Sequence, residues 1–384
     1  MHIGIVSHSY PTEDYPSRGK FIQDEAHLLS STEDITVFIP TIFAPFISSK
    51  KHNIVSEPFP FIEFPYLSFP KKRFPKIIQK SITRHFIRSI PQNLPDLIHV
   101  HGLYPSGLIL PELNQRKFKT VLTIHGGDWY YTRNGERLKH LLNNSLDAAN
   151  QIIVAGVKLQ KDILQFRPSL QPKMNLIPFG VDTNFFQPVN DKSQLRDKMG
   201  WKHGAVHLLC VANMWPVKGL DVLVNAIDQG LQDMCYQFHF VSPPRDPKYS
   251  NEIHKMVRDK HLQNIHFYPE QKREDLLHFY QAADIFISPS RRESFGIALI
   301  EAAATGLPIV ATKSGGPEQI VTPEIGLLTE NENPVNLAKK IKNLTDNLDN
   351  YPSSKIRENI TLRFSEITKK ARLLELYMKV LVEE

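Results

Sequence analysis

The 384-residue sequence predicts an α/β protein with two doubly wound halves. Short apolar runs rich in β-branched residues alternate with longer mixed runs of helical character, and this alternation occurs twice along the chain. Near-continuous apolar strands between helices are typical of parallel sheets that are covered on both faces. The length agrees with two halves, because a chain of this size is too long for one ordinary hydrophobic core.

The first half contains four segments that we expect to be strands, because each is a short run of β-branched or other apolar residues. These segments are residues 2–8 (HIGIVSH), 35–40 (ITVFIP), 97–102 (LIHVHG) and 120–126 (TVLTIHG). A helix is expected over residues 21–30 (FIQDEAHLLS).

Phe-Pro dipeptides recur every five residues between residues 59 and 75. Proline at this density excludes a helix or a central strand, so we expect an extended surface segment. The stretch that follows has apolar residues at helical spacing among its basic residues, namely Ile77, Ile78, Ile82, Phe86 and Ile87. This pattern fits a basic amphipathic helix on a membrane, and it also fits an ordinary surface helix with one buried face.

Positive charge is concentrated in the same part of the chain. The whole chain has a net charge of +6. Between Lys50 and Pro91 there are nine basic and two acidic residues, so this segment alone carries 9 − 2 = +7. We expect residues 71–90 to make peripheral contact with an anionic membrane. Nucleic acid is not expected as a partner, because the segment is rich in proline and the chain lacks a recognition motif.

The second half repeats the alternation of strands and helices. The expected strands are residues 206–213, 236–242, 265–269, 285–290 and 308–312. The expected helices are residues 220–231, 273–283 and 296–306.

The two halves meet after residues 175–188 (NLIPFGVDTNFFQP), where the chain becomes polar before the new strand series begins. We therefore expect one domain over residues 1–188 and a second over 189–364. A last helix is expected over 365–384, packing back toward the first domain.

Cellular location is predicted from what the sequence lacks. No apolar run is long enough to span a bilayer, and the first ten residues look like a strand rather than a signal peptide. Cys210 and Cys235 both lie in apolar runs, so we expect buried, reduced thiols. The expected location is the cytoplasm, with peripheral contact at the inner face of the membrane through the basic segment.

One segment, SRRESFGIALIEAAATGLPIV (290–310), has the features of a ligand site. It follows an expected strand, and ligands of doubly wound sheets bind at the carboxyl ends of the strands. The free backbone N–H groups of Ser294–Ile297 and the dipole of the next helix favour an anion such as a diphosphate. Glu293 and Glu301 would repel phosphate, but they are good acceptors for sugar hydroxyls. The combination suits a nucleotide sugar; the alternative is that Glu293 caps the helix and Glu301 is solvated.

The chain resembles the retaining GT-B-fold glycosyltransferases of family 4 (glycosyl transferases group 1) over essentially its whole length. The family's E-x7-E pattern is present as Glu293 and Glu301, and SGGPEQIV (314–321) follows it. Further segments similar to the family's are IPFGVDTNFFQP at the linker, PDLIHVHG and TIHGGD in the first half, and FYPEQKREDLLHFYQAADIFISPS before the first glutamate. The resemblance implies a GT-B fold, in which two Rossmann-like domains face each other across a cleft. The first domain would take the acceptor and the second the nucleotide sugar.

The resemblance also implies roles for residues at the donor. Glu293 would contact hydroxyls of the transferred sugar, Glu301 would bind the ribose, and positively charged Lys218 would stabilise the departing diphosphate. The remaining donor contacts would come from Gly19, Tyr268, Glu270, Ser294, Phe295, Gly296 and Ile297. On the acceptor side, His125 would face the reacting sugar as a catalytic residue, with His101 and Asp128 beside it. The alternative for both histidines is a role in the core, and no Cys/His spacing supports a zinc site.

One departure from the family concerns the diphosphate. The family usually has arginine in a VGR triplet after the first strand of the second domain, and this chain has VAN with Asn213. We expect Arg291 or Arg292 to supply the missing charge.

The expected function is retaining transfer of a sugar from a UDP- or GDP-sugar to a glycan or lipid-linked acceptor at the inner membrane face, as in polysaccharide biosynthesis. The reaction would not need a metal. The alternatives are a nucleotide-sugar-binding protein without transferase activity, and a GT-B epimerase or phosphorylase.

Overall fold

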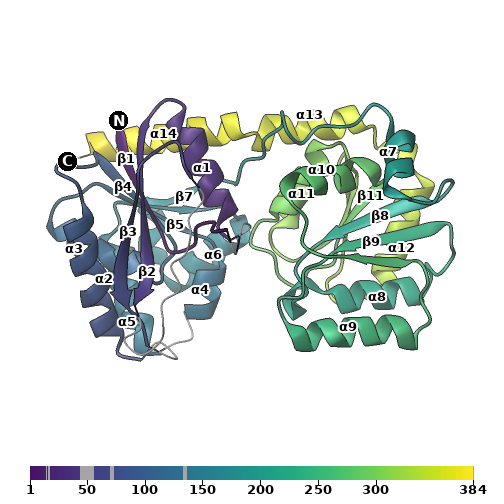
Figure 1. Cartoon of the computed structure of the whole chain (residues 1–384), viewed down its shortest axis with the longest axis horizontal. Helices are drawn as coiled ribbons and strands as arrows, with labels where there is room; N and C mark the ends of the chain where they lie inside the picture. Colours follow the sequence, from purple (N-terminus) through teal and green to yellow (C-terminus); the bar gives the residue numbers. More distant parts are fainter. Residues whose placement is uncertain (14, 16–17, 44–55, 70–72, 133–135, 384) are drawn as a thin grey trace. The chain divides into compact units, whose positions relative to one another are not determined.

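The computed structural model describes residues 1–13, 15, 18–43, 56–69, 73–132 and 136–383. Two compact units make up the chain, and each is a parallel α/β sandwich (Figure 1). Unit 1 consists of Met1–Ala155, Leu159–Pro178 and Lys369–Glu384, and unit 2 of Gly156–Lys158 and Phe179–Thr368.

The chain passes from unit 1 to unit 2 between Pro178 and Phe179. The sequence had predicted this boundary at residue 188. The intervening residues pack in unit 2. The ring centroids of Phe179 and Phe295 are 5.5 Å apart, and those of Phe186 and Tyr280 are 5.9 Å apart. The Val181 N–H also donates to the Phe364 carbonyl at 2.8 Å. Residues 179–188 therefore belong to unit 2, because their aromatic side chains pack there.

Unit 1 is built on a seven-stranded sheet in the order β3-β2-β1-β4-β5-β6-β7, with every pair parallel. The strands are β1 (His2–Ser7), β2 (Asp34–Phe43), β3 (Phe61–Leu67), β4 (Leu97–His101), β5 (Thr120–Ile124), β6 (Gln151–Val154) and β7 (Met174–Leu176). The chain order reverses between β1 and β4, which makes their carboxyl ends the switch point where ligands bind in such sheets.

Two layers of helices cover this sheet (Figure 1). The helices α1 (Lys20–Ser30) and α14 (Glu366–Val382) pack on the face that carries Ile3 and Ile5. The opposite face carries Val6 and is covered by α2 (Pro75–Ser89), α3 (Leu110–Gln115), α5 (Glu136–Ala148) and α6 (Val157–Phe166). The short helix α4 (Gly127–Thr132) follows β5. Alternate strand residues thus serve two separate cores, as a doubly covered parallel sheet requires.

The Phe-Pro segment forms strand β3 at the edge of the sheet. Phe64 and Tyr66 are 2% and 4% exposed, so the segment is part of the core and not only a surface extension. Pro65 is tolerated because an edge strand has one row of backbone groups that needs no partner.

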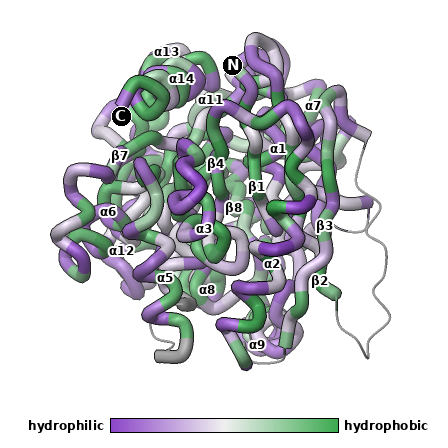
Figure 2. Tube along the Cα trace, turned by 90° about the vertical axis from the view of Figure 1, so that its left-hand side faces the viewer, coloured by the Kyte–Doolittle hydropathy of each residue, from purple (hydrophilic) through white to green (hydrophobic). Residues whose placement is uncertain are grey.

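The basic helix α2 buries most of its apolar stripe, although Ile77 is 48% exposed. Ile78, Ile82 and Phe86 are fully buried, and the Phe86 ring contacts Phe38 and Phe64. Figure 2 shows hydrophilic and hydrophobic residues interleaved along this helix. The apolar face is therefore used by the protein core, as in the ordinary-helix alternative, and the basic face remains at the surface.

Unit 2 is built on a six-stranded parallel sheet in the order β10-β9-β8-β11-β12-β13. The strands are β8 (Val206–Val211), β9 (Tyr236–Val241), β10 (Ile265–Tyr268), β11 (Ile285–Ser288), β12 (Ile309–Thr312) and β13 (Gly326–Thr329). One face is covered by α8 (Leu220–Asp228), α9 (Pro247–Asp259) and α12 (Pro334–Asp346). The remaining helices of this unit are α7 (Lys192–Met199), α10 (Arg273–Ala282), α11 (Ile297–Ala304) and α13 (Ser353–Phe364).

The α/β class with two doubly wound sheets is confirmed, and every strand expected from the sequence is present. The sequence interpretation missed β3, β6, β7 and β13. Cys210 is buried as expected, but Cys235 is exposed just before β9, so the prediction of a buried thiol was wrong there. None of the helices among the described residues is long and apolar enough to cross a membrane.

Candidate active site

The switch point of unit 2 lies between β8 and β11, where the strand order reverses. Lys218 follows β8 in a short 3-10 helix (Pro216–Lys218), and Glu293 lies in the loop after β11. Nζ of Lys218 is 2.6 Å from Oε2 of Glu293, and both side chains are partly exposed. The structure thus brings together two predicted site residues at the edge of the sheet where doubly wound folds bind ligands.

Arg291 holds the two loops of this site together. Its guanidinium donates to both carboxylate oxygens of Asp221 at 2.8 and 2.7 Å and to the Pro216 carbonyl at 2.7 Å. Its backbone N–H donates to the Val217 carbonyl at 2.9 Å. These bonds join the loop of Lys218 to the loop of Glu293, so Arg291 has a structural role in the site.

The expectation that Arg291 supplies the missing diphosphate charge does not fit this geometry. Arg291 is also paired with Glu332 at 2.8 Å, so two carboxylates already compensate its charge. The hydrogen bond with Asp221 raises the pKa of Arg291. Arg292, the neighbouring residue, is exposed. Asn213 lies just beyond β8, where its carbonyl accepts the Trp215 N–H at 2.8 Å.

The glycine turn after Glu293 opens helix α11. Gly296 is the N-cap with φ of 108°, a left-handed conformation that favours glycine. No side chain caps this helix, so the alternative that Glu293 serves as the cap was wrong. The Glu293 N–H donates to the Ser314 carbonyl at 3.0 Å, and the Phe295 side chain is buried. These contacts fix the backbone of Ser294–Ile297 at the N-terminus of α11, where backbone N–H groups favour an anion.

Glu301 lies farther along α11 and accepts a hydrogen bond from the Tyr280 hydroxyl at 2.8 Å. Burial raises the pKa of Tyr280 well above its ordinary value, so the hydroxyl keeps its proton and donates. Glu301 is half-buried, which contradicts the alternative of a fully solvated side chain.

Tyr268 and Glu270, which were expected to contact the donor, have protein partners. Tyr268 ends β10, and its hydroxyl lies 3.1 Å from Nδ1 of His239. Glu270 accepts from the Arg245 guanidinium at 3.0 and 3.1 Å. Both residues lie at the carboxyl end of β10, which β9 separates from β8, and neither is paired with Lys218 or Glu293 in the contacts of the described residues.

Unit 1 has an open pocket of about 650 Å³ at the carboxyl ends of β1, β4 and β5. Its lining includes the three residues predicted for the acceptor side, His101, His125 and Asp128. Aromatic side chains, among them Phe21 and Tyr66, form another part of the wall. A pocket of this size with a few polar groups on an aromatic wall suits a sugar or another small acceptor.

Asp128 anchors the loops of this pocket. Its carboxylate accepts from the backbone N–H groups of Leu103, His125 and Trp129 at 2.8, 3.1 and 3.0 Å. Burial raises the pKa of Asp128, and the backbone donors act in the opposite direction. Asp128 therefore ties the loop after β4 to the loop after β5, which positions His125.

Gly19 is the N-cap of α1, with φ of 68°. A Cβ atom there would lie 2.0 Å from the Ser9 carbonyl oxygen, so only glycine permits this close approach to the loop after β1.

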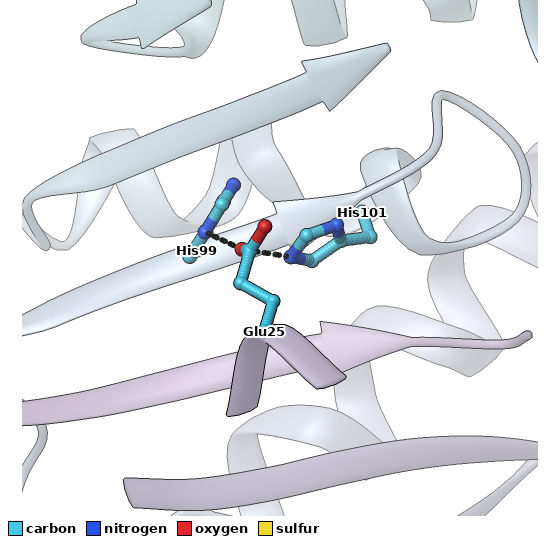
Figure 3. A group of neighbouring side chains, drawn as sticks. All are labelled: Glu25, His99 and His101. Atoms are coloured by element: carbon cyan, nitrogen blue, oxygen red, sulfur yellow. Dashed lines mark ion pairs between the residues drawn. The ribbon is translucent and has the colours of Figure 1, made fainter. Parts of the chain in front are cut away.

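A buried cluster of charged and polar residues lies behind His101 (Figure 3). Glu25 of α1 reaches toward β4, where Oε1 lies 3.3 Å from Nδ1 of His99 and 3.3 Å from Nε2 of His101. Nζ of Lys369 on α14 lies 2.6 Å from Oε2 of Glu25. The sequence interpretation missed Glu25 and Lys369, because each lies in an amphipathic helix far along the chain from the histidines.

Glu25, His99 and His101 are close enough to one another to hold a metal ion, a grouping the sequence did not predict. The Lys369 ammonium, however, already places a positive charge on the carboxylate. A divalent ion would have to displace this ammonium inside a buried site, so the charges present favour an ion pair over a metal.

Histidine burial predicts acid sensitivity of unit 1. Burial, followed by the charge of His101, lowers the pKa of His99 from 6.5 to about 4. The unfolded chain therefore binds a proton that the folded chain does not, and stability falls as the pH drops below 6.5. We expect His99 to contribute a loss of about 1.3 kcal/mol in the free energy of unfolding between about pH 7.5 and about pH 5.5. Urea denaturation at both values measures this; a His99→Gln variant that shows the same pH dependence as the wild type would contradict it.

Two family models match the chain in succession. The model described as Glycosyltransferase Family 4 matches residues 34–185, and the model described as Glycosyl transferases group 1 matches residues 191–361. The first match lies in the half that holds the His125 pocket, and the second in the half that holds Lys218 and Glu293.

Similar proteins from other organisms agree with these models. An uncharacterised glycosyltransferase of Methanocaldococcus jannaschii is 26% identical over 339 residues, 88% of this chain and 88% of that protein. A GDP-mannose-dependent monoacylated α-(1-6)-phosphatidylinositol monomannoside mannosyltransferase of Corynebacterium glutamicum is 31% identical over 240 residues, 59% of this chain and 61% of that protein.

Solved structures share the fold over nearly the whole chain. Sucrose-phosphate synthase from Thermosynechococcus elongatus has a TM-score of 0.81 at 22% identity, with 99% of each chain covered. HepE from Anabaena, solved in complex with UDP-glucose, has a TM-score of 0.76 at 18% identity, with 99% of this chain and 100% of that chain covered. Family models, relatives and fold agree, and the chain belongs to the GT-B glycosyltransferases of the family 4 type.

Proposed function

We propose that this glycosyltransferase moves a sugar, with retention of configuration, from a nucleoside diphosphate sugar bound by unit 2 to an acceptor that binds in the pocket of unit 1. The observation that carries the proposal is the Lys218–Glu293 pair beside the N-terminus of α11. This arrangement offers an ammonium and backbone N–H groups to an anion, and a carboxylate to hydroxyl groups.

The charges of this site fit the two chemical parts of a nucleotide sugar. A diphosphate would draw Lys218 away from Glu293, because it carries more negative charge than one carboxylate. Glu293 would then be free to accept from hydroxyls of the sugar, and Glu301 from those of the ribose. In the transition state Lys218 and the helix dipole would stabilise charge that develops on the leaving diphosphate. This division of roles needs no metal ion.

The relatives support a UDP- or GDP-sugar as donor and a lipid-linked acceptor or glycan. HepE was solved with UDP-glucose, and the corynebacterial enzyme is named for GDP-mannose and a phosphatidylinositol mannoside. We propose that the present enzyme uses a donor of this class at the inner face of the membrane.

A donor-panel assay tests the proposal. The purified chain is incubated with UDP-, GDP- and ADP-sugars and an extract of lipid-linked glycans, and the product is analysed by mass spectrometry and NMR of the new anomeric bond. We expect transfer from one donor class with the anomeric configuration of the donor. Free sugar phosphate would indicate a phosphorylase, an epimerised donor without acceptor an epimerase, and calorimetric binding without turnover a binding protein. Each of these three results, or an inverted anomer, would overturn the proposal.

The basic face of α2 supports peripheral contact with an anionic membrane. A surface groove of about 770 Å³ is lined by Lys76, Lys80, Arg84, Arg88 and Arg116, together with polar residues of α3 and α5. Residues 71 and 72 of the expected segment lie outside the described residues. Because Ile78, Ile82 and Phe86 of the apolar stripe are buried in the core, this contact would be mainly electrostatic and not an insertion of the helix.

Liposome sedimentation gives the corresponding prediction. Vesicles with about 30% phosphatidylglycerol should bind the chain at least tenfold more strongly than neutral vesicles, and salt should weaken the binding. Lys80→Glu with Arg84→Glu should abolish most of it. Lys339→Glu with Lys342→Glu, the same charge change on exposed residues of α12, is the control and should retain binding. Equal binding to neutral vesicles would contradict the electrostatic contact.

A further inference from the structure

Side chains in contact connect helix α14 to the pocket of unit 1. The chain of contacts begins at Lys369, passes through Glu25 to His101, and ends at His125, whose Nε2 lies 3.3 Å from Nδ1 of His101. His125 lines the pocket, whereas Glu25 is only 6% exposed and lies behind it. Glu25 and Lys369 have no place in the donor or acceptor contacts proposed above, although a buried charge pair is costly to maintain.

Glu25 is a carboxylate at neutral pH. Burial alone would raise its pKa, but the Lys369 ammonium and His101 hold it well below its ordinary value. An ionised carboxylate can only accept hydrogen bonds. Its contact with Nε2 of His101, at 3.3 Å, is electrostatic, and it favours the form of His101 that carries its proton on Nε2.

The proton position in His101 determines that in His125. When Nε2 of His101 is protonated, its Nδ1 carries a lone pair, and this lone pair faces Nε2 of His125. The proton of His125 is then favoured on Nε2, which leaves Nδ1 as the acceptor. Burial lowers the pKa of His125 well below its ordinary value, so the ring is neutral. A neutral imidazole has one donor and one acceptor nitrogen, so the tautomer decides whether Nε2, beside His101, or the buried Nδ1 is the donor.

The surroundings also fix the orientation of these groups. The planes of the His101 and His125 rings differ by only 9°, and the centroid of the Phe21 ring lies 4.8 Å from that of His125 at an interplanar angle of 63°. His99 contacts the same oxygen of Glu25 at 3.3 Å, and its Nδ1 lies 2.7 Å from the Tyr377 hydroxyl of α14. Helix α14 thus contacts the carboxylate directly through Lys369, and it contacts His99 through Tyr377.

We propose that Glu25 and Lys369 are positioning residues that fix the tautomer and ring orientation of His125 in the acceptor pocket. This inference rests on the proposed function, in which His125 faces the reacting sugar. A carboxylate held by a lysine and directed at a histidine orients that histidine for a defined hydrogen-bonding role. Helix α14 would then support the acceptor pocket through Lys369 and Glu25, which lie behind His101.

The test combines a spectroscopic and a kinetic measurement on the full chain. Long-range ¹H–¹⁵N NMR of histidine-labelled protein reports the tautomers, with signals assigned from His101→Gln and His125→Gln. In the wild type we expect the Nε2–H form of both rings. In Glu25→Gln the side-chain amide donates to His101, so His101 and His125 should change tautomer. In the transfer assay kcat should fall at least tenfold while KM for the donor stays within twofold.

Two further variants make the outcome decisive. Lys369→Met removes the ammonium that keeps Glu25 ionised, so burial favours a protonated carboxyl that donates to His101. The tautomers should then change in the same direction, which covers the case that Glu25→Gln does not fold. Glu57→Gln is the matched control, because Glu57 is a fully buried carboxylate of the same unit that contacts Tyr10, Gln23 and His27 but not His101. It should leave the tautomers and kcat unchanged.

Unchanged tautomers in folded Glu25→Gln or Lys369→Met would overturn the inference, and so would an equal change in Glu57→Gln. The NMR measurement needs no turnover. An absence of transfer by the wild type would therefore refute the proposed function separately from the positioning of His125.

Discussion

Lys218→Ala should lower kcat for sugar transfer by about 10²- to 10³-fold, because it removes the ammonium that lies 2.6 Å from the Glu293 carboxylate. Glu293→Gln should cost about 10²-fold, since an amide replaces the carboxylate that accepts from sugar hydroxyls. The stability of both variants should change by only about 1 kcal/mol or less, because the ion pair is partly exposed. Steady-state kinetics with the donor found in the panel assay, together with urea denaturation, measures both effects.

Lys260→Ala is the matched control for this prediction. Lys260 pairs with Asp228 in the same unit with similar exposure of both side chains, but it lies at the end of α9, away from the loops after β8 and β11. Its activity should stay within twofold of the wild type. Lys218→Ala with wild-type kcat would show that the site lies elsewhere.

Gly316→Ala should both destabilise unit 2 and abolish most activity. The backbone of Gly316 has an ordinary φ of −78°, so alanine is not excluded by conformation. Its Cβ, however, would lie 2.1 Å from the carbonyl oxygen of Phe295 and 2.6 Å from its Cα. These are backbone atoms of a buried residue, and no side-chain rotation relieves the clash.

The expected consequence of Gly316→Ala is a loss of about 1–3 kcal/mol in the free energy of unfolding. The backbone of Ser294–Ile297 would also shift, and a displacement of about 1 Å at a reacting centre can cost about 10²-fold in rate. Thermal denaturation and donor binding by calorimetry measure these two effects.

Gly230→Ala provides the comparison, because a Cβ at Gly230 meets nothing within 4 Å. That variant should bind the donor and unfold like the wild type. Equal behaviour of the two alanine variants would contradict the packing of SGG (314–316) against Phe295 as the support of the site.

The sequence indicated the donor side of the site well, because that side depends on local order. Lys218 and Glu293 each follow a strand that was recognisable from its apolar run, and neighbouring parallel strands bring their carboxyl ends together. Arg291 shows the limit of this argument. The sequence shows the charge of Arg291 but not its pairing with Asp221. Arg291 was therefore expected to supply charge to the diphosphate, whereas in the structure it joins two loops.

Two of the strands missed in unit 1 have physical explanations. β3 carries Pro65, and only its position at the edge of the sheet makes a proline acceptable there. β7 is three residues long, too short for an alternation pattern to be distinguished from a loop. Length does not explain the miss of the four-residue β6, because β10, β11 and β12 are equally short and were recognised.

The two parallel α/β halves, the family and the order of the site motifs could be predicted from the amino-acid sequence, because strand and helix periodicity and loop chemistry are local properties. Which charges meet could be seen only in the folded protein. Glu25 from α1, His101 from β4 and Lys369 from α14 lie far apart along the chain, and they become one buried cluster because both helices pack on the same face of the sheet. The pKa of a buried group depends on its partner and on the exclusion of water, and neither can be inferred from a short stretch of residues.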